Sequence, residues 1–284
     1  MAQFTNQAQL SYNNSVISSN IAVGEILEVL SGAKTSLTNE YTLGEDVTYV
    51  ISAVNSGTTA ITDLSVTDDL GAYTVGGETL YPLTYTADSV RMYINGVLQP
   101  APVVSAGPPL VFSGITLPAD SNLIIAYEAQ VNRFAPLDTF GSITNTATVD
   151  GNGIPSPITV TETVTPEAAP DLTITKSIQP IPVTENSRVT YTFLVQNYGN
   201  TAAEADANAV ITDTFDPILT DIIVTFNGTT WAEGTQFTYD ETTGLFSTAA
   251  GEITVPAATY TTDPETGAVV ITPGVSTLTV TGTI

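Results

Sequence analysis

Apolar and polar residues alternate with a period of two along most of this chain, which predicts β-strands. Runs rich in threonine, valine, isoleucine and tyrosine recur, such as DVTYVISAV, RVTYTFLVQ, TNTATV and TLTVTGT. The pairs Asn95-Gly96 and Asn227-Gly228 each predict a hairpin turn between two such runs. Turn signals separate the strands at the spacing of a β-sandwich, and no long amphipathic helix pattern is visible. We therefore expect an all-β protein.

The strand pattern is repeated within the chain. GAKTSLTNEYTLGEDVTYVISAVNSG around Lys34 matches TITKSIQPIPVTENSRVTYTFLVQNYG around Lys176, and the chain has no other lysine. Further on, ITDLSVTDDL matches NAVITDTF, which aligns Asp68 with Asp213. The two Asn-Gly hairpins follow in the same order. We expect two tandem domains, at residues 30–166 and 167–284.

The first copy carries a hairpin that the second copy lacks. It reads GSITNTATVDGNGIPSPITVTETVTP, roughly residues 142–165, and nothing in the numbering follows Ile284 to match it. The counterpart is at residues 1–29, where FTNQAQL matches ITNTATV and aligns Asn6 with Asn145. The order hairpin, core, hairpin, core implies that each hairpin completes the core that precedes it.

This order leaves the N-terminal hairpin without a core and the last core without a hairpin. A core that lacks its closing strands exposes apolar surface and unpaired backbone groups. A neighbouring copy could supply the missing strands through a head-to-tail contact, and such a contact can propagate. The alternatives are an incomplete chain or a monomer whose N-terminus folds back. Residues 30–33 form a short link to the first core, so we expect the fold-back to be strained.

Strand parity predicts that one lysine, one aspartate and one asparagine point into the core of each domain. For the first domain these are Lys34, Asp68 and Asn145. For the second domain they are Lys176, Asp213 and the N-terminal Asn6 of another copy. The inward face of the donor strand would also carry Phe4, Ala8, Leu10 and Tyr12.

Buried together, these side chains could react. Desolvation lowers the pKa of a lysine and raises that of an aspartate. A neutral amine is a nucleophile, and a protonated carboxyl can polarise the asparagine carbonyl and pass protons to the departing ammonia. The product is a Lys–Asn isopeptide bond, with Asp68 and Asp213 in the catalytic role and a single turnover. The alternative is a Lys–Asp ion pair beside a hydrogen-bonded asparagine.

Both halves resemble the bacterial conserved-repeat surface domain, catalogued as domain of unknown function number eleven. The similar segments are LTITKS, VTYTFLVQNYGNT and VITDTF in the second half and VTYVISAVNSGTT, SVTDDL and ITNTATV in the first. The resemblance implies immunoglobulin-like sandwiches used on cell surfaces or in fibres. The Lys-Asp-Asn sets are also similar to the isopeptide triads of Gram-positive pilin and adhesin domains, which often carry glutamate as the acid.

Composition removes several classes of function. Acidic residues outnumber basic ones 29 to 5, for a net charge of -24, which disfavours nucleic acid and anionic lipid as partners. Without cysteine or histidine we expect no disulfide, no metal site of the usual zinc kind and no cofactor. Asp68 and Asp69 face opposite sides of a strand and cannot flank one glycosidic bond, so we expect no enzyme. Glu204, Asp206 and Asn208 could hold Ca²⁺, although a solvated loop is the preferred interpretation.

The remaining signals concern location and partners. No apolar run approaches the ~18 residues of a membrane span, and MAQFTNQAQL lacks the features of a secretory signal. The end, TLTVTGTI, carries no anchoring signal, and we expect a cell-surface or spore-surface appendage. The preferred function is a structural subunit of an extracellular fibre, a pilus or spore appendage, built from copies of this chain. The alternative is an adhesin or surface-layer stalk with intramolecular bonds only, but Trp231 and the scattered arginines form no binding patch.

Overall fold

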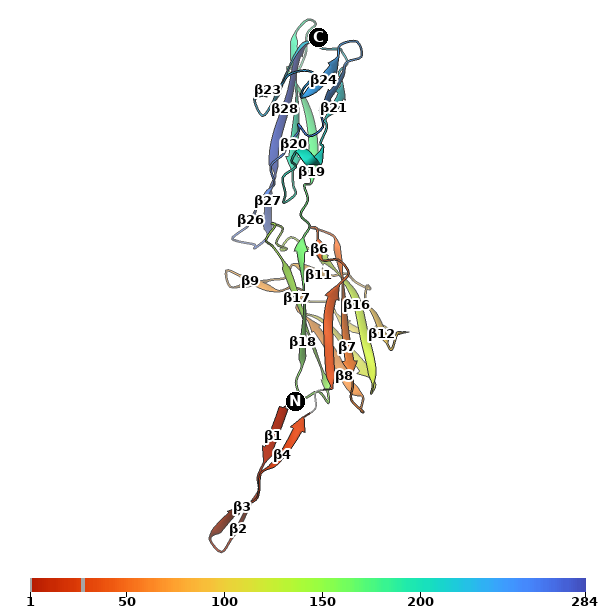
Figure 1. Ribbon diagram of the computed structural model, residues 1–284, viewed down its shortest axis with the longest axis vertical. Helices are drawn as coiled ribbons and strands as arrows, with labels where there is room; N and C mark the ends of the chain where they lie inside the picture. The colour runs from red at the N-terminus through yellow and green to blue at the C-terminus, as the bar shows by residue number, and fades with distance from the viewer. Residues whose placement is uncertain (1, 27–28) are drawn as a thin grey trace. The chain divides into compact units, whose positions relative to one another are not determined.

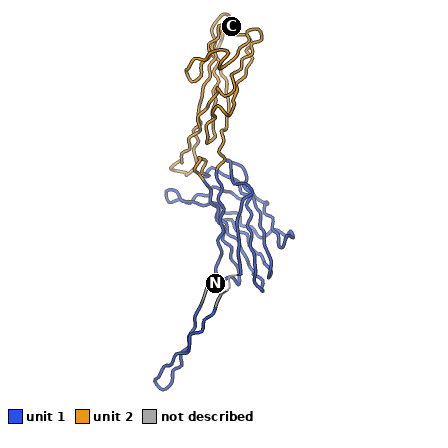
Figure 2. The backbone as a smooth tube through the Cα atoms, in the orientation of Figure 1, with its two compact units in different colours: residues 1–135, 142–165 blue, residues 136–141, 166–284 orange. Residues whose placement is uncertain are grey.

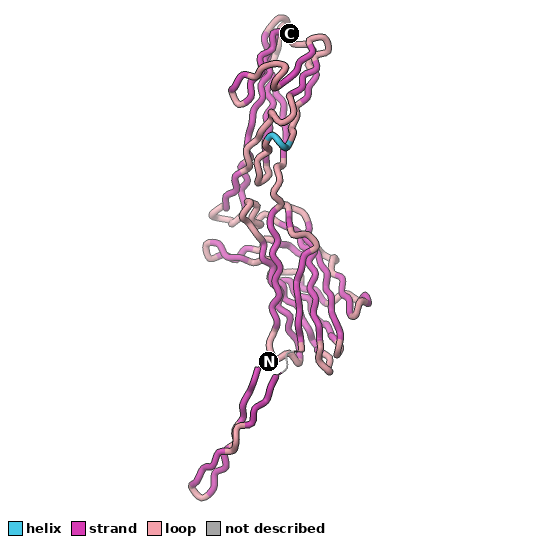
Figure 3. The backbone as a smooth tube through the Cα atoms, in the orientation of Figure 1, coloured by secondary structure: helices cyan, strands magenta, loops and turns pink. Residues whose placement is uncertain are grey.

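The computed structural model describes residues 2–26 and 29–284, and their regular secondary structure is almost entirely β (Figures 1 and 3). The chain divides into two compact units, unit 1 with residues 1–135 and 142–165, and unit 2 with residues 136–141 and 166–284 (Figure 2). Within the described residues the helical content is one turn, η1 (Ala205–Ala207). The all-β class expected from the period-two pattern is confirmed.

Unit 1 contains a sandwich of two antiparallel six-stranded sheets. The first sheet contains β13 (Val97–Gln99), β12 (Arg91–Ile94), β16 (Ser121–Val131), β7 (Asp46–Asn55) and β5 (Leu30–Ser36) in that order, with β11 (Leu83–Tyr85) also paired to β16. The second sheet contains β14 (Val103–Ser105), β15 (Leu110–Leu117), β8 (Ile61–Asp68), β17 (Ile143–Asn152), β18 (Ile158–Pro166) and β6 (Glu40–Tyr41). A separate ladder pairs β9 (Tyr73–Val75) with β10 (Glu78–Leu80).

The core of unit 1 comes from alternate residues of these strands. On β7 every second side chain is buried, from Val47 to Asn55, as the period-two pattern requires. Phe112 of β15 packs against Tyr127 of β16, with 5.3 Å between ring centroids, and so joins the two sheets. The internal hairpin β17–β18 adds buried Ala147 and Val164 to this core, which confirms that it completes the first sandwich.

Unit 2 repeats the arrangement with fewer strands. One sheet contains β19 (Leu172–Gln179), β20 (Arg188–Asn197), β28 (Gly274–Thr283), β22 (Thr220–Phe226) and β23 (Thr229–Thr230). The other contains β21 (Thr212–Thr214), β25 (Leu245–Thr248) and β24 (Phe237–Asp240), and a separate ladder pairs β26 (Thr259–Thr262) with β27 (Val269–Thr272). Phe193, Phe215 and Phe246 lie at the centre of its core.

Matching details confirm the internal repeat. Asn55 ends β7 and Asn197 ends β20, and both are fully buried. Each side-chain oxygen accepts a hydrogen bond from the N–H of the glycine two residues later, and each Nδ2 donates to backbone carbonyls. The Asn-Gly turns also lie where expected, between β12 and β13 and between β22 and β23. Both residues of each turn have positive φ, which asparagine and glycine tolerate.

The N-terminal hairpin is present, with one difference from the expected strand. β1 (Ala2–Asn6) pairs with β4 (Ala22–Ile26), and β2 (Gln9–Tyr12) pairs with β3 (Ser15–Ser18), so the first strand of the hairpin is interrupted at residues 7 and 8. At the interruption Ser19 contacts both residues, and its N–H donates to the carbonyl of Ala8 at 2.8 Å. Its Oγ accepts from the N–H of Ala8, and its carbonyl accepts from Gln7 Nε2.

Two boundaries drawn from the sequence need correction. Residues 30–33 are not a linker, because β5 begins at Leu30; residues 27 and 28 lie outside the described residues. Residues 136–141 belong with unit 2 and not with the first domain. Asn200 Nδ2 donates to the carbonyls of Leu137 and Glu167, which holds this segment to unit 2.

Candidate functional site

Lys34, Asp68 and Asn145 meet in the core of unit 1. Lys34 lies on β5 and reaches across the sandwich to Asp68 on β8, with 2.6 Å between Nζ and Oδ2. Asn145 lies on the adjacent strand β17, where Ala147 pairs with Asp68, so the asparagine occupies the same inner face two residues away. The three residues are 4%, 0% and 0% exposed. Their inward orientation is confirmed, and their reaction stays a prediction.

Tyr127 of β16 links the aspartate to the asparagine. Its hydroxyl donates to Asp68 Oδ2 and accepts from Asn145 Nδ2 at 3.3 Å. Asp68 Oδ1 accepts from the N–H of Leu70 at 2.9 Å, so both oxygens of the carboxyl group are engaged. Sequence reasoning missed Tyr127. The available signal was a tyrosine in the inward-facing row of SNLIIAYEAQV, where the other members are apolar or small.

Burial sets the protonation of this cluster. It lowers the pKa of Lys34, although the Asp68 carboxylate acts in the opposite direction. Burial and the same carboxylate raise the pKa of Tyr127 and of Tyr49, whose ring centroid lies 4.9 Å from Lys34 Nζ. Lys34 is therefore closer to the neutral, nucleophilic amine than a solvated lysine is, and Tyr127 stays protonated as a hydrogen-bond donor.

Ser36 and Glu162 make a second contact beside this cluster that sequence reasoning missed. Ser36 follows Lys34 by two residues on β5, and Glu162 lies directly opposite Asn145 in the β17–β18 ladder. Glu162 Oε1 accepts from Ser36 Oγ at 2.8 Å and from the Ser36 N–H at 3.3 Å. No sequence signal marked this pair, because the two residues are 126 positions apart.

Lys176 and Asp213 form the corresponding pair in unit 2. Lys176 Nζ contacts Asp213 Oδ2, and the ring centroid of Tyr191 lies 4.6 Å from this Nζ. The side chains of Lys176 and Asp213 are 40% and 18% exposed, whereas those of Lys34 and Asp68 are fully buried. The second pair is therefore assembled but still open to water.

The exposure follows from missing strands. In unit 1, β8 lies between β15 and β17, whereas its counterpart β21 pairs with β25 alone and forms the edge of its sheet. Leu172 and Ile174 of β19 are consequently 38% and 52% exposed. With neighbouring residues of unit 2 they line a hollow of about 160 Å³. Its other lining residues are Thr173, Val195, Ala209, Val210, Ile211 and Ile253.

The two sites differ at the tyrosine. Tyr127 pairs with Tyr49 in the β16–β7 ladder, and Val280 pairs with Tyr191 in the equivalent β28–β20 ladder. Val280 therefore stands where unit 1 has the hydroxyl that bridges aspartate and asparagine. The second site lacks this hydrogen-bond donor.

Asn6 and its neighbours are exposed on the N-terminal hairpin. Asn6 lies on β1, opposite Ala22 of β4. Phe4, Leu10 and Tyr12 are 55%, 63% and 53% exposed, and Ala8 is exposed as well. A two-stranded ribbon has no second layer to cover such side chains. The structure thus brings together the first three residues of the predicted site and pairs Lys176 with Asp213, while Asn6 lies on an uncovered ribbon.

The sequence also singled out an acidic loop and the lone tryptophan. Glu204, Asp206 and Asn208 lie at and around η1 and are exposed, and no group of three or more acidic residues suited to a metal ion occurs among the described residues. Trp231 packs against Phe226 with 5.0 Å between ring centroids, as expected for a residue beside its hairpin. In the part of the chain that the structure describes, no helix has the length and hydropathy to cross a membrane.

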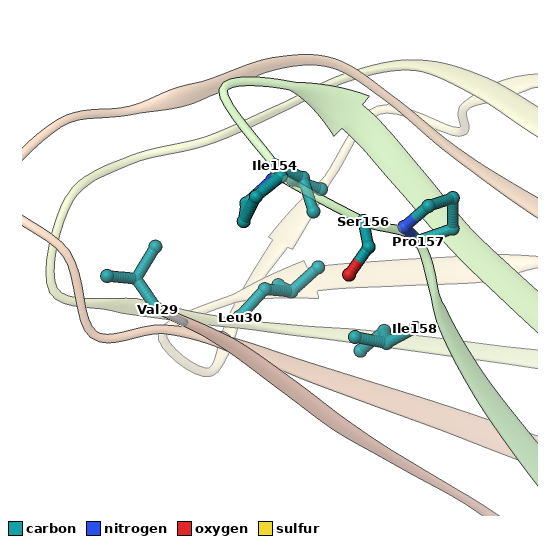
Figure 4. Close-up of a pocket in the computed structure, with 7 residues that line it drawn as sticks. Val29, Leu30, Ile154, Ser156, Pro157 and Ile158 are labelled. Carbon is teal, nitrogen blue, oxygen red and sulfur yellow. The ribbon is translucent and has the colours of Figure 1, made fainter. Parts of the chain in front are cut away.

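A further hollow, of about 240 Å³, lies in unit 1 beside the turn between β17 and β18 (Figure 4). It is lined by Val29 and Leu30, which precede and begin β5, and by residues 154–158. Its lining has no titratable side chain, so it offers no reacting group. It does place the start of β5 next to the start of β18.

Comparison with known proteins gives low similarities. No protein-family model and no curated protein matches the chain, so the likeness to the conserved-repeat domain remains a resemblance. Among solved structures, the chain is similar to a variant of the major pilin subunit of Bacillus cereus, at 10% identity over 94% of this chain and 70% of that chain, with a TM-score of 0.39.

Two further similarities are to the pilus backbone of Streptococcus pneumoniae and to the collagen-binding domain of a Staphylococcus aureus adhesin. The first has 10% identity over 86% of this chain and 55% of that chain, with a TM-score of 0.36. The second has 10% identity over 49% of this chain and 99% of that chain, with a TM-score of 0.31. This chain thus spans about half of the pneumococcal protein, and similarities of this size carry no functional argument.

Proposed function

We propose that the protein is a structural subunit of an extracellular fibre, such as a pilus or a spore appendage, that polymerises head-to-tail. One observation carries the proposal. Unit 2 exposes an apolar hollow and a lysine–aspartate pair at an open sheet edge, while the N-terminal hairpin matches the hairpin that fills the same place in unit 1. The partner is therefore a second copy of this chain.

The contacts of unit 1 supply the register of the proposed joint. Ala147 lies opposite Asp68 there, so Ala8 of one copy would lie opposite Asp213 of the next, with Asn6 beside Lys176. The joint would cover Leu172 and Ile174 with the apolar face of the hairpin. Full burial of one large apolar side chain contributes about 1.5–3 kcal/mol, and these side chains start roughly half exposed.

The position of the hairpin on unit 1 supports a propagating contact. The hairpin joins unit 1 at the start of β5, which lies next to Ile158 (Figure 4). β18 runs from Ile158 to Pro166, roughly 26 Å at the rise of an extended strand, before the chain leaves unit 1. The entry and the exit therefore lie at opposite ends of this sandwich. This separation favours donation to another molecule over fold-back.

Each site then forms one amide bond. The neutral lysine Nζ attacks the asparagine Cγ, the Cγ–Nζ bond forms, and the Cγ–Nδ2 bond breaks. The aspartate takes a proton from the attacking amine and returns one to the leaving group, which departs as ammonia. Lys34 would join Asn145 within one chain, and Lys176 would join Asn6 of the next. The reaction occurs once per site, so the protein is not an enzyme.

Denaturing electrophoresis of the assembled protein tests the proposal. The wild type should run as a ladder after boiling, because covalent joints survive unfolding, while Asn6→Ala should form threads in electron micrographs that dissociate into monomers on the gel. Asn20→Ala, an exposed asparagine on the same hairpin, is the matched control and should keep the ladder. A ladder that persists in Asn6→Ala would contradict the assignment of Asn6.

An adhesin or surface stalk with an intramolecular bond alone is the second candidate. The complete burial of Lys34, Asp68 and Asn145 within one chain favours it. Each bond lowers the intact mass by roughly 17 Da, the mass of one ammonia. Compact single particles with one such loss would support the stalk, and threads with two losses per internal subunit would support the fibre.

A further inference from the structure

In unit 1 a polar contact between Glu162 of the hairpin and Ser36 of the core lies beside the reacting cluster. The residues at the corresponding positions of the proposed joint are different. In unit 1, Glu162 lies directly opposite Asn145 and accepts hydrogen bonds from the N–H and Oγ of Ser36. Both residues are partly buried. The carboxylate of the hairpin is therefore matched by two donors on the first core.

The equivalent positions on the N-terminal hairpin and on unit 2 are both apolar. Ala22 lies directly opposite Asn6, as Glu162 lies opposite Asn145. Ile178 follows Lys176 by two residues and pairs with Tyr191, as Ser36 follows Lys34 and pairs with Tyr49. Ile178 is partly buried against the core of unit 2.

We propose that the residue opposite each asparagine selects the core that its hairpin enters: Glu162 matches Ser36 of unit 1, and Ala22 matches Ile178 of unit 2. This inference rests on the proposed donation of the N-terminal hairpin. It assigns a specificity-determining pair to each joint, and it names the N-terminal hairpin of a second copy as the occupant of the hollow beside β19.

The two pairs select between hairpins because placing either hairpin on the other core removes the favourable partner of one residue. The internal hairpin on unit 2 would bring the Glu162 carboxylate against Ile178, which has no side-chain donor, and burying a carboxylate without a partner is unfavourable. The N-terminal hairpin on unit 1 would place Ala22 against Ser36 and remove the acceptor of two hydrogen bonds. Each core therefore favours its own hairpin, and N-terminal hairpins do not displace the internal one.

Ala22→Glu in the full chain tests the pair. We expect ladder formation to slow by about tenfold or more, because the new carboxylate faces Ile178 in the joint. The double variant Ala22→Glu/Ile178→Ser should recover most of the wild-type rate, since it recreates the Glu162–Ser36 pair. Ala22→Glu/Ile178→Thr repeats the rescue with a β-branched residue, in case serine destabilises β19.

Val23→Glu is the matched control, because it places the same charge on the opposite face of the same strand. Its counterpart Thr163 is exposed in unit 1, and the variant should form the ladder at the wild-type rate. The inference falls if Ala22→Glu assembles within twofold of the wild type, or if neither double variant exceeds Ala22→Glu. If the wild type itself forms no ladder, the proposed function fails and this inference fails with it, so the two failures are distinguishable.

Discussion

Individual side chains around Lys34 have separate tasks. Asp68 holds the amine, Tyr127 connects Asp68 to the asparagine amide, and Tyr49 covers the amine with its ring. The carbonyl oxygen of Asn145 is buried and accepts no hydrogen bond among the described residues.

Tyr127→Phe should slow the formation of the Lys34–Asn145 bond by about tenfold. The hydroxyl is hydrogen-bonded to a carboxylate, and such a bond is worth roughly 1.5 kcal/mol, which corresponds to that factor in rate if it orients the reacting groups. Intact mass at timed intervals after refolding measures the loss of ammonia. Tyr73→Phe, which removes a hydroxyl bonded to the carbonyl of Phe134, should lower stability without slowing the reaction. If Tyr127→Phe forms the Lys34–Asn145 bond as fast as Tyr73→Phe does, Tyr127 has no role in the reaction.

Without the cross-link, the stability of unit 1 should rise with pH in the window below 10.5, the ordinary pKa of lysine. Folding lowers the pKa of Lys34 below its ordinary value of 10.5, so the unfolded chain binds more protons across this window. The free energy of unfolding of Asn145→Ala, measured with urea at several pH values, should therefore increase with pH. The slope should become smaller in Lys34→Met/Asn145→Ala. If the free energy of unfolding depends on pH equally in both variants, Lys34 is not the cause of that dependence.

At the scale of elements, the hairpin is the unit that we propose is exchanged between copies. The hairpin β17–β18 is bound in its own chain, while the N-terminal hairpin carries a corresponding asparagine and exposed apolar side chains. Sheet edges such as that of β21 present unpaired backbone groups that accept an added strand. The two observations together make strand addition the natural way to complete unit 2.

Leu10→Asp should abolish threads, whereas Ser11→Asp should preserve them. Leu10 corresponds to fully buried Val149, while Ser11 corresponds to exposed Asp150, so only the first variant buries a carboxylate in the joint. Both positions are exposed in the monomer, and the thermal stability of the monomer should not change. Electron microscopy at equal protein concentration gives the comparison. Threads formed by Leu10→Asp would contradict the predicted register.

At the scale of the whole molecule, the N-terminal hairpin and the open sheet edge that we propose receives it lie on the same chain. A contact between unlike surfaces of identical copies does not saturate, so it builds filaments unless the rotation closes a ring. The net charge of -24 keeps free subunits apart, and the covalent joints would hold them once joined.

Mixing Lys176→Ala with Asn6→Ala should give covalent dimers and nothing longer. Each variant alone lacks one of the two reacting groups and should give only monomers on a denaturing gel. In the mixture, Lys176 of one variant can reach Asn6 of the other, and the product has no further reactive pair. If Lys176 reacted only with Asn6 of its own chain, the mixture would contain no covalent dimer. The absence of dimers would therefore contradict polymerisation.

The sequence alone determined the β class, the two repeats, the hairpin turns and the inward orientation of Lys34, Asp68 and Asn145. These depend on local rules, since alternation of period two sets the face of a side chain and Asn-Gly sets a turn. Comparison of the two copies also identified the N-terminal hairpin as the counterpart of the hairpin at residues 142–165. The assignment of Asn6 to Lys176 of another copy stays a prediction.

Only the tertiary structure decided which side chains meet between sheets. Tyr127 reaches Asp68, and Ser36 reaches Glu162, because strands distant in sequence pack in one particular register. The exposed hollow of unit 2 and the interruption of the N-terminal hairpin at residues 7 and 8 likewise appeared only there. Parity fixes the face of a residue, but the partner across the core depends on sheet packing, which no local pattern encodes.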